Sequence, residues 1–136
     1  MVSTLSPTLL ALVFAGGGAG SVGRLVVGTL LNPADTSKQG LPWGTLTVNA
    51  AGCLLLGVLL GAMAADRVGQ PAALALGVGV LGGFTTFSAF GVETASMVNG
   101  GRPTAAIAYA LASVIAGVIA AGAGAFIATQ VWGRGG

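Results

Sequence analysis

One short stretch of the chain, GGFTTFSAFG at positions 82–91, combines residue types that could hold an ion. It contains three of the chain's five phenylalanines, three glycines, two threonines and one serine. Glycine permits non-helical backbone, and hydroxyl groups can donate hydrogen bonds to an anion. Phenyl rings have electropositive edges and electronegative faces. These groups could bind an ion through backbone, hydroxyl or ring atoms.

Other polar residues recur at four-residue steps within apolar segments, so that each pair shares one helix face. The pairs are Thr45 with Asn49 and Tyr109 with Ser113, and Arg24 lies near the end of the first segment. Polar groups in hydrocarbon are costly unless they find a partner or a wet cavity, which makes these residues functional candidates. Each also has a structural interpretation, because arginine can snorkel from a helix end and an amide can bond another helix.

The composition predicts that these residues lie in a membrane. Of the 136 residues, 54% are hydrophobic and 6% are charged, whereas a soluble domain carries roughly 25% charged residues. Four apolar stretches exceed the roughly 20 residues that cross a hydrocarbon core of about 30 Å. They are 6–31, 43–65, 71–99 and 103–132. We therefore expect an all-α integral membrane protein with four transmembrane helices in a single domain, 1–136.

Short links with turn-forming residues separate the four stretches. They lie at 32–42, 66–71 and 99–103, and each contains proline and glycine. Such links predict antiparallel neighbouring helices. The start of the chain, Met1 to Leu12, lacks the basic beginning of a secretory signal and continues into the first stretch, so we expect the first helix to be retained.

The third stretch is too long for a straight span, since 71–99 would reach roughly 44 Å as one helix. The sequence Gly-Gly-Phe-Thr-Thr at 82–86 lies near its middle. Irregular backbone at membrane depth is tolerated where it is buried in protein or faces water or an ion. We therefore expect the third helix to be broken in the middle, with the two glycines and two threonines in the break. Phe87 and Phe90 would share one face of the helix that resumes.

This arrangement favours a small anion over a cation. Two phenyl edges and several hydrogen-bond donors would line a path that carries no carboxylate. Phe87 and Phe90 have a second interpretation as ordinary packing aromatics. Glu93 is the one acid inside the four stretches, and we expect it to pair with a polar or basic group at an interface.

Positive charges are balanced across the predicted membrane. Four spans place Arg67 and Arg134 on one side and Lys38 and Arg102 on the other. Because Lys and Arg set orientation, this tie predicts insertion in both orientations and favours an antiparallel homodimer. Orientation could instead be fixed by other features, such as Arg24.

Glycine supplies 25 of the 136 residues and recurs at four-residue spacing. Such pairs allow close approach of helices in a membrane, where no hydrophobic effect drives helix association. The surfaces that they offer exceed what one small bundle would use, which predicts oligomerisation. The pairs are Gly16 with Gly20, Gly57 with Gly61 and Gly79 with Gly83.

These features together resemble a known family, the Fluc (CrcB) fluoride channels, over essentially the whole chain. The resemblance rests on GGFTTFSAF in the third stretch, LTVNAAGCLLLG around Asn49, GGGAGSVGRLVVG around Arg24, and Tyr109 with Ser113 in the fourth. It implies a dual-topology homodimer in the inner (plasma) membrane of a microbe, with two antiparallel pores that export fluoride passively and select against chloride. The implied partners are fluoride, a second copy and the lipid bilayer, without nucleic acid.

The resemblance also implies roles for individual residues. Phe87 and Phe90 would face the pore, and Arg24 would lie near its entrance. The backbone carbonyls of Gly82 and Thr85 from both subunits would hold a central structural Na⁺ at the dimer interface. The polar pathway would include Asn49, Ser88, Tyr109 and Ser113.

Three other classes of function compete with a channel. A small dual-topology proton-coupled multidrug exporter needs a titratable carboxylate in its cavity, and Glu93 is the available candidate. An enzyme is not expected, because the chain has no histidine, one cysteine and no paired acids for acid–base or metal chemistry. A purely structural assembly partner would leave the polar interruption of the third stretch unexplained.

Overall fold

The computed structural model describes residues 6–32 and 40–133. Lys38 and Arg134, which contribute to the predicted charge balance, lie outside the described residues. So do positions 1–5 of the predicted retained start and most of the first predicted link.

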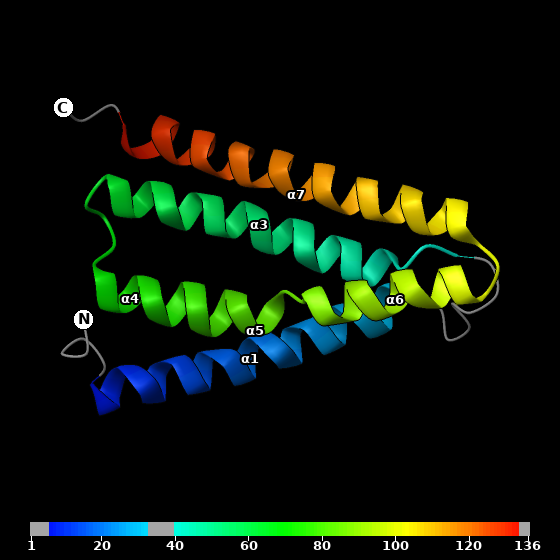
Figure 1. The fold of residues 1–136 in the computed structure, drawn as a ribbon. Coiled ribbons are helices and arrows are strands. Elements are labelled where there is room, and N and C mark those ends of the chain that lie inside the picture. The colour runs from blue at the N-terminus through cyan, green and yellow to red at the C-terminus, as the bar shows by residue number, and fades with distance from the viewer. Residues whose placement is uncertain (1–5, 33–39, 134–136) are drawn as a thin grey trace.

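The described chain consists of helices, three of them continuous and one interrupted (Figure 1). All four are long and apolar enough to cross a membrane, which confirms the prediction of an all-helical membrane protein with four spans. Helix α1 begins at the end of the bundle where α7 ends, as an even number of crossings requires (Figure 1). The spans are α1 (Pro7–Leu31), α3 (Trp43–Ala64), the interrupted Gln70–Asn99 and α7 (Pro103–Trp132).

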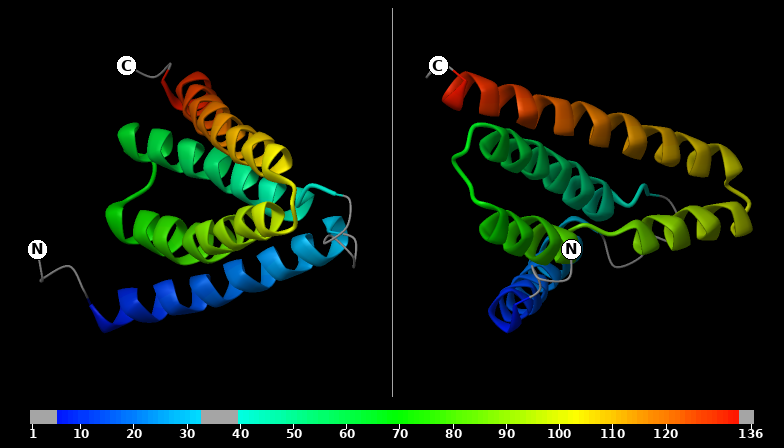
Figure 2. Two further views of the ribbon diagram at one scale, coloured as in Figure 1. Left: turned by 45° about the vertical axis from the view of Figure 1, so that its right-hand side comes forward. Right: turned by 60° about the vertical axis from the view of Figure 1, so that its left-hand side comes forward.

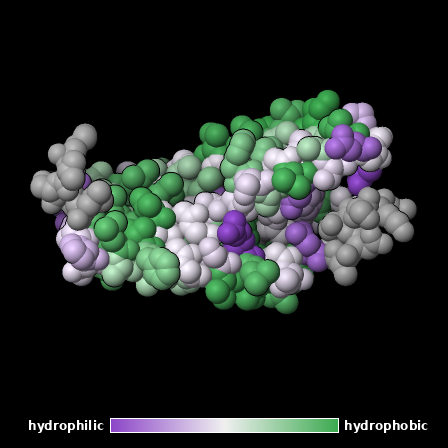
Figure 3. Space-filling model, turned by 60° about the horizontal axis from the view of Figure 1, so that its bottom comes forward, coloured by the Kyte–Doolittle hydropathy of each residue, from purple (hydrophilic) through white to green (hydrophobic). Residues whose placement is uncertain are grey.

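Large apolar side chains cover the outside of the bundle. Phe14 is 85% exposed, Leu30 is 77% exposed and Val118 is 69% exposed. The face in Figure 3 is mainly white and green, and its purple hydrophilic residues gather near the middle and toward one end. Contact of such an apolar surface with lipid chains is favourable, whereas its contact with water is not.

Helices α3 and α7 pack side by side along most of their lengths (Figures 1 and 2). Small residues allow this approach, because a Cβ atom at Gly124 would overlap the Leu54 carbonyl of α3. A Cβ atom at Gly57 would in turn overlap the Ala121 carbonyl of α7. This contact forms the longest seam in the fold.

Helix α1 packs across the first half of the third span, where a Cβ atom at Gly20 would overlap the Val80 carbonyl. All three glycine pairs noted in the sequence therefore meet neighbouring helices inside one subunit. These three pairs are used inside one subunit, and the expected oligomerisation stays a prediction.

The third span is divided, as predicted. It begins as α4 (Gln70–Leu74), continues as a π-helix, η2 (Ala75–Leu81), and one turn of helix, α5 (Gly82–Phe84), and resumes as α6 (Phe87–Asn99). Between α5 and α6 the chain is extended, and Figure 1 shows it as a thin connection. Thr85 has φ −79° and ψ 157°, and Thr86 has φ −151° and ψ 119°.

The two glycines before the break have a different role from the expected one. Gly82 and Gly83 lie in the helical turn of α5, so the prediction that they supply non-helical backbone is wrong. A Cβ atom at Gly83 would overlap the Gly17 carbonyl, which shows that its small size serves the contact with α1. The two threonines alone form the extended segment.

Candidate functional site

The break in the third span is held open by Asn49 of α3. The Thr86 amide donates to Asn49 Oδ1 at 2.8 Å, and Asn49 Nδ2 donates to the Thr86 carbonyl at 3.0 Å. One side chain thus satisfies both polar groups of an extended residue at membrane depth, where unpaired backbone is costly. The sequence shows Asn49 as an amide inside an apolar stretch but does not reveal this pairing.

Hydroxyl groups complete the two helix ends at the break. The Thr85 amide and Oγ1 both donate to the Leu81 carbonyl at 2.9 Å, which closes α5. Thr86 is the N-cap of α6, because its Oγ1 accepts from the Ala89 amide at 3.1 Å. A threonine three residues before the capped amide is a recognisable helix-start signal, so the sequence could have placed this N-cap.

Backbone carbonyls at the break lose their helical partners, among them those of Gly82 and Thr85. In a continuous helix the amides of Thr86 and Ala89 would bond the carbonyls of Gly82 and Thr85. Here those amides bond Asn49 and the Thr86 hydroxyl, and within residues 6–32 and 40–133 no hydrogen bond reaches either carbonyl. Gly82 and Thr85 both line a cleft of about 320 Å³. Carbonyl oxygens freed in this way have the chemistry that hard cations prefer.

A row of three aromatic rings begins beside the break and runs into the protein. The centroids of Phe87 and Phe90 are 5.5 Å apart, and those of Phe90 and Tyr109 are 5.4 Å apart. Phe87 is 82% exposed, whereas Tyr109 is 1% exposed. Ser88 is exposed beside the first ring, with its hydroxyl 3.2 Å from Thr86 Oγ1. The row therefore leads from the subunit surface to its buried interior.

At the inner end of this row, a carboxylate links three helices, so the expectation that the path carries no carboxylate is wrong at this end. Glu93 of α6 accepts from Thr45 Oγ1 of α3 and from the Tyr109 hydroxyl of α7, each at 2.7 Å. The expectation that Glu93 pairs with polar groups at an interface is confirmed. The four-residue spacing showed that Thr45 and Tyr109 lie on polar faces, but only the tertiary structure shows that both faces turn toward one acid.

Ser113 lies one turn beyond Tyr109 on α7. Its Oγ is a buried side-chain atom without a hydrogen-bond partner among the described residues. The next position on this face, Gly117, lies close to Cys53 of α3, since an added Cβ would be 3.5 Å from Cys53 Sγ. Ser113 thus continues the polar face of α7 toward Cys53 of α3.

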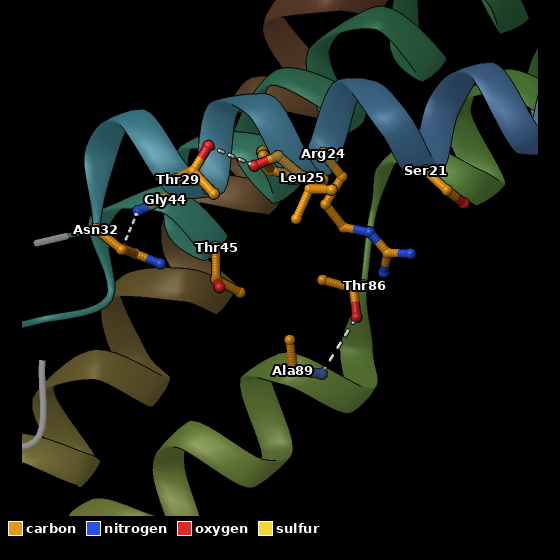
Figure 4. A pocket seen from close by; sticks show the side chains of 11 residues that line it. Ser21, Arg24, Leu25, Thr29, Asn32, Gly44, Thr45, Thr86 and Ala89 are labelled. Atoms are coloured by element: carbon orange, nitrogen blue, oxygen red, sulfur yellow. Dashed lines mark hydrogen bonds between the residues drawn. The ribbon is translucent and has the colours of Figure 1, made fainter. Parts of the chain in front are cut away.

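Arg24 lines a separate cleft of about 520 Å³ between α1, α3 and α6. Figure 4 shows its guanidinium extending into this cleft toward Thr86, while Thr45 borders the cleft from α3. Ser21, Thr29 and Asn32 also line the cleft, so its wall carries one cation and several polar groups. Thr86 joins this cleft to the break, and Thr45 joins it to the Glu93 cluster.

The structure thus brings together most of the predicted site residues. Asn49, Ser88 and Phe87 lie at the break, and Phe90 and Tyr109 continue the row of rings. Ser113 follows one turn beyond Tyr109. Arg24 is apart from the rings, on the other cleft.

This fold and site define a class, a polytopic membrane protein with a polar interruption in one span. The chain matches the model of the family described as CrcB-like protein, Camphor Resistance (CrcB), over residues 11–125. The chain therefore belongs to the CrcB family, which confirms the resemblance seen in its motifs.

Individual relatives match over most of their lengths. The chain is 49% identical to the "Fluoride-specific ion channel FluC" of Novosphingobium aromaticivorans, over 82% of this chain and 88% of the relative. It is 43% identical to the "Fluoride-specific ion channel FluC 1" of Rubrobacter xylanophilus, over 89% of this chain and 94% of the relative. The "Fluoride-specific ion channel FluC" of Caulobacter sp. is 45% identical, over 92% of this chain and 98% of the relative.

Proposed function

We propose that this chain forms a fluoride-specific ion channel, the function that the names of its relatives state. The observation that carries the proposal is the row of rings at the break, which runs from exposed Phe87 past Phe90 to buried Tyr109. We infer a path here because the exposed ring of Phe87 lies beside an extended segment with hydroxyl and carbonyl groups. The relatives are described as channels, not enzymes.

The path must replace the water that surrounds a fluoride ion, because a bare charge in a low-dielectric interior is costly. The ring edges of Phe87 and Phe90 supply positive electrostatic potential without charge. Ser88 and Ser113 supply hydroxyl donors, and Ser113 has no competing partner in the described chain. Asn49 uses one amide hydrogen on the Thr86 carbonyl and retains a second for the ion.

Arg24 would act before the ion enters the path. Its guanidinium lies in a polar cleft that borders the break at Thr86. A cation in a cleft with low-dielectric walls raises the local concentration of anions. Arg24 thus attracts fluoride to an entrance without binding it tightly inside the row of rings.

The functional unit is an antiparallel homodimer with two pores. Phe87 is 82% exposed on one subunit, and a second copy would enclose the open side of this ring. The two-against-two distribution of basic residues supports insertion in both orientations. Two breaks meeting on the dimer axis would bring the freed carbonyls of Gly82 and Thr85 from both subunits around one point. These four oxygens would hold a structural Na⁺, which would neutralise their partial negative charges.

The contacts of Glu93 do not favour the alternative of a proton-coupled exporter. Both oxygens of this carboxylate accept hydrogen bonds, from Thr45 and from Tyr109. Glu93 also borders a hollow of about 390 Å³, but these hydrogen bonds tie its carboxylate into the contact of three helices, whereas an exporter needs an acid that is free to exchange protons with its cavity. Passive flow of fluoride requires no such exchange.

Anion efflux from liposomes containing the purified protein tests the channel proposal. We expect rapid loss of internal fluoride down its gradient and no chloride loss above that of protein-free liposomes. Equal flux of both anions would overturn the fluoride specificity. Flux of fluoride only when a proton gradient is imposed would overturn the channel mechanism.

Biased insertion tests the dimer proposal. Three lysines added to the C-terminal tail should fix one orientation and abolish fluoride efflux when this variant is expressed alone. Co-expression with a variant biased the opposite way should restore efflux. Full activity of one fixed orientation by itself would contradict the antiparallel arrangement.

A further inference from the structure

Two hollows meet at Trp132, at the end of the bundle where α3 and α7 finish. The first has a volume of about 490 Å³ and is lined by Asp66, Arg67, Thr129 and Trp132, among others. The second has a volume of about 370 Å³, and its wall is apolar and includes Leu55, Leu76 and Trp132. Neither hollow includes a residue of the proposed fluoride path.

The two hollows lie at different depths in the membrane. Helix α3 has 22 residues, so it is roughly 33 Å long and just crosses the hydrocarbon core. The polar hollow surrounds its last residues and therefore lies at the level of the lipid headgroups. The apolar hollow extends along α3 from Ala62 back to Leu55, roughly 10 Å deeper. A polar pocket above an apolar groove matches the shape of a phospholipid.

The charges in the polar hollow form a pair that is not satisfied internally. Asp66 and Arg67 are exposed neighbours, and in the described part of the chain neither side chain makes an ion pair or a hydrogen bond. The C-terminal ends of α3 and α7 add partial negative charge. The hollow thus offers one cation to a phosphate and a region of negative potential to an amine.

The backbone at Asp66 determines where its carboxylate lies. Asp66 has φ 54°, and the amides of Asp66 and Arg67 donate to the carbonyls of Met63 and Ala62 at 3.0 and 2.9 Å. This is a Schellman ending of α3, in which the left-handed position usually holds glycine. Aspartate is one of the few residues besides glycine that adopt this conformation, so the turn sets the position of the Asp66 carboxylate at the end of α3.

We propose that these hollows bind one phospholipid whose headgroup ends in a primary ammonium, as in phosphatidylethanolamine. The Arg67 guanidinium binds the phosphate, and Asp66 with the α3 and α7 carboxyl ends accepts hydrogen bonds from the ammonium. One acyl chain lies along Leu55 and Leu76 beneath Trp132. Interfacial tryptophan is suited to this position, because its ring contacts chains while its N–H faces headgroups.

A lipid fits these hollows better than a second copy of the chain does. A protein partner that covered them would have to bury the unpaired charges of Asp66 and Arg67, whereas a zwitterionic headgroup complements both. Lipid binding here is independent of fluoride conduction, so either proposal can fail alone.

Native mass spectrometry of the full-length protein with dioleoyl lipids tests the proposal. We expect at least a five-fold preference for phosphatidylethanolamine over phosphatidylcholine, whose quaternary amine cannot donate hydrogen bonds, and over anionic phosphatidylglycerol. Asp66→Asn tolerates the left-handed backbone but loses the charge, and should reduce retention of phosphatidylethanolamine to that of phosphatidylcholine. Arg67→Ala should weaken retention of all three lipids.

A matched charge removal at the opposite end of the bundle, Arg102→Ala, is the control and should leave the preference unchanged. Asp66→Gly separates binding from folding, because it should raise the melting temperature while abolishing the preference. Equal retention of the three lipids by the wild-type protein would overturn the proposal. So would an unchanged preference in Asp66→Asn, or retention of phosphatidylglycerol above the other two.

Discussion

Small residues allow close helix packing both in the seam between α3 and α7 and in the third span, but only the third span is interrupted. Along the seam both helices are continuous, and glycines such as Gly57 and Gly124 let one backbone rest against the carbonyls of the other. In the third span, helical glycines seat the first half against α1, and the chain then opens at Thr85 and Thr86.

The difference concerns where the backbone polar groups find partners. In the seam each continuous helix satisfies its own amides and carbonyls, so the packing needs only shape. At the break one side chain, Asn49, satisfies the extended residue, and the carbonyls of Gly82 and Thr85 remain free. The continuous helices α3 and α7 thus support the irregular segment at Thr85 and Thr86. This agrees with the rule that irregular backbone in a membrane occurs only where it is buried in protein or faces water or an ion.

The largest expected effect tests the shape requirement of the seam. Gly124→Leu would force a side chain against the Leu54 carbonyl and should destabilise the fold by more than about 3 kcal/mol. Little or no folded protein should elute on size-exclusion chromatography. Gly122→Leu is the matched control on the same helix, since an added Cβ there meets no atom within 4 Å. Equal yields of the two variants would show that α3 and α7 can move apart at Gly124 without loss of the fold.

A smaller effect is expected from removing the side chain that holds the break. Asn49→Ala leaves the amide and carbonyl of Thr86 without partners and should cost about 2 kcal/mol or more. Its melting temperature and its fluoride efflux should both fall. Thr47→Ala, on an exposed position of the same helix, should change neither. A stable, fully active Asn49→Ala protein would show that the break holds itself open.

The row of rings should affect transport more than folding. Phe90→Ile keeps an apolar side chain but loses the electropositive ring edge, so fluoride efflux should fall at least about tenfold, or about 1.4 kcal/mol in the barrier. The melting temperature should change little. Phe126→Ile replaces a ring that is 64% exposed on α7 and should leave efflux unchanged. Normal efflux through the Phe90 variant would assign this ring to packing alone.

The smallest effect is expected at Thr85. Thr85→Ser keeps the backbone and the hydroxyl that donates to the Leu81 carbonyl, and it loses one methyl group. We expect a stability change below about 1 kcal/mol and normal efflux, because the proposed ion ligand is the carbonyl. A large loss of efflux would indicate that the side chain takes part directly.

Much of this architecture could be predicted from the sequence. Apolar stretches of the right length predict four spans, and the excess length around 82–86 predicts an interruption. The exact place of the break could not be predicted, because glycine can serve either irregular backbone or close helix packing. Gly83 serves packing only because α1 happens to lie against it.

The amino-acid sequence by itself determined that this protein lies in a membrane, how many spans it has and which polar groups the spans contain. The length of an apolar stretch and the residue types in it are local properties of the sequence. Tertiary structure decided which groups meet. Glu93 receives its hydrogen bonds from residues 48 positions earlier and 16 positions later, and Asn49 reaches Thr86 across 37 positions. Such pairings depend on how neighbouring helices are rotated and shifted, and in a membrane that is set by close packing of small residues rather than by an apolar face.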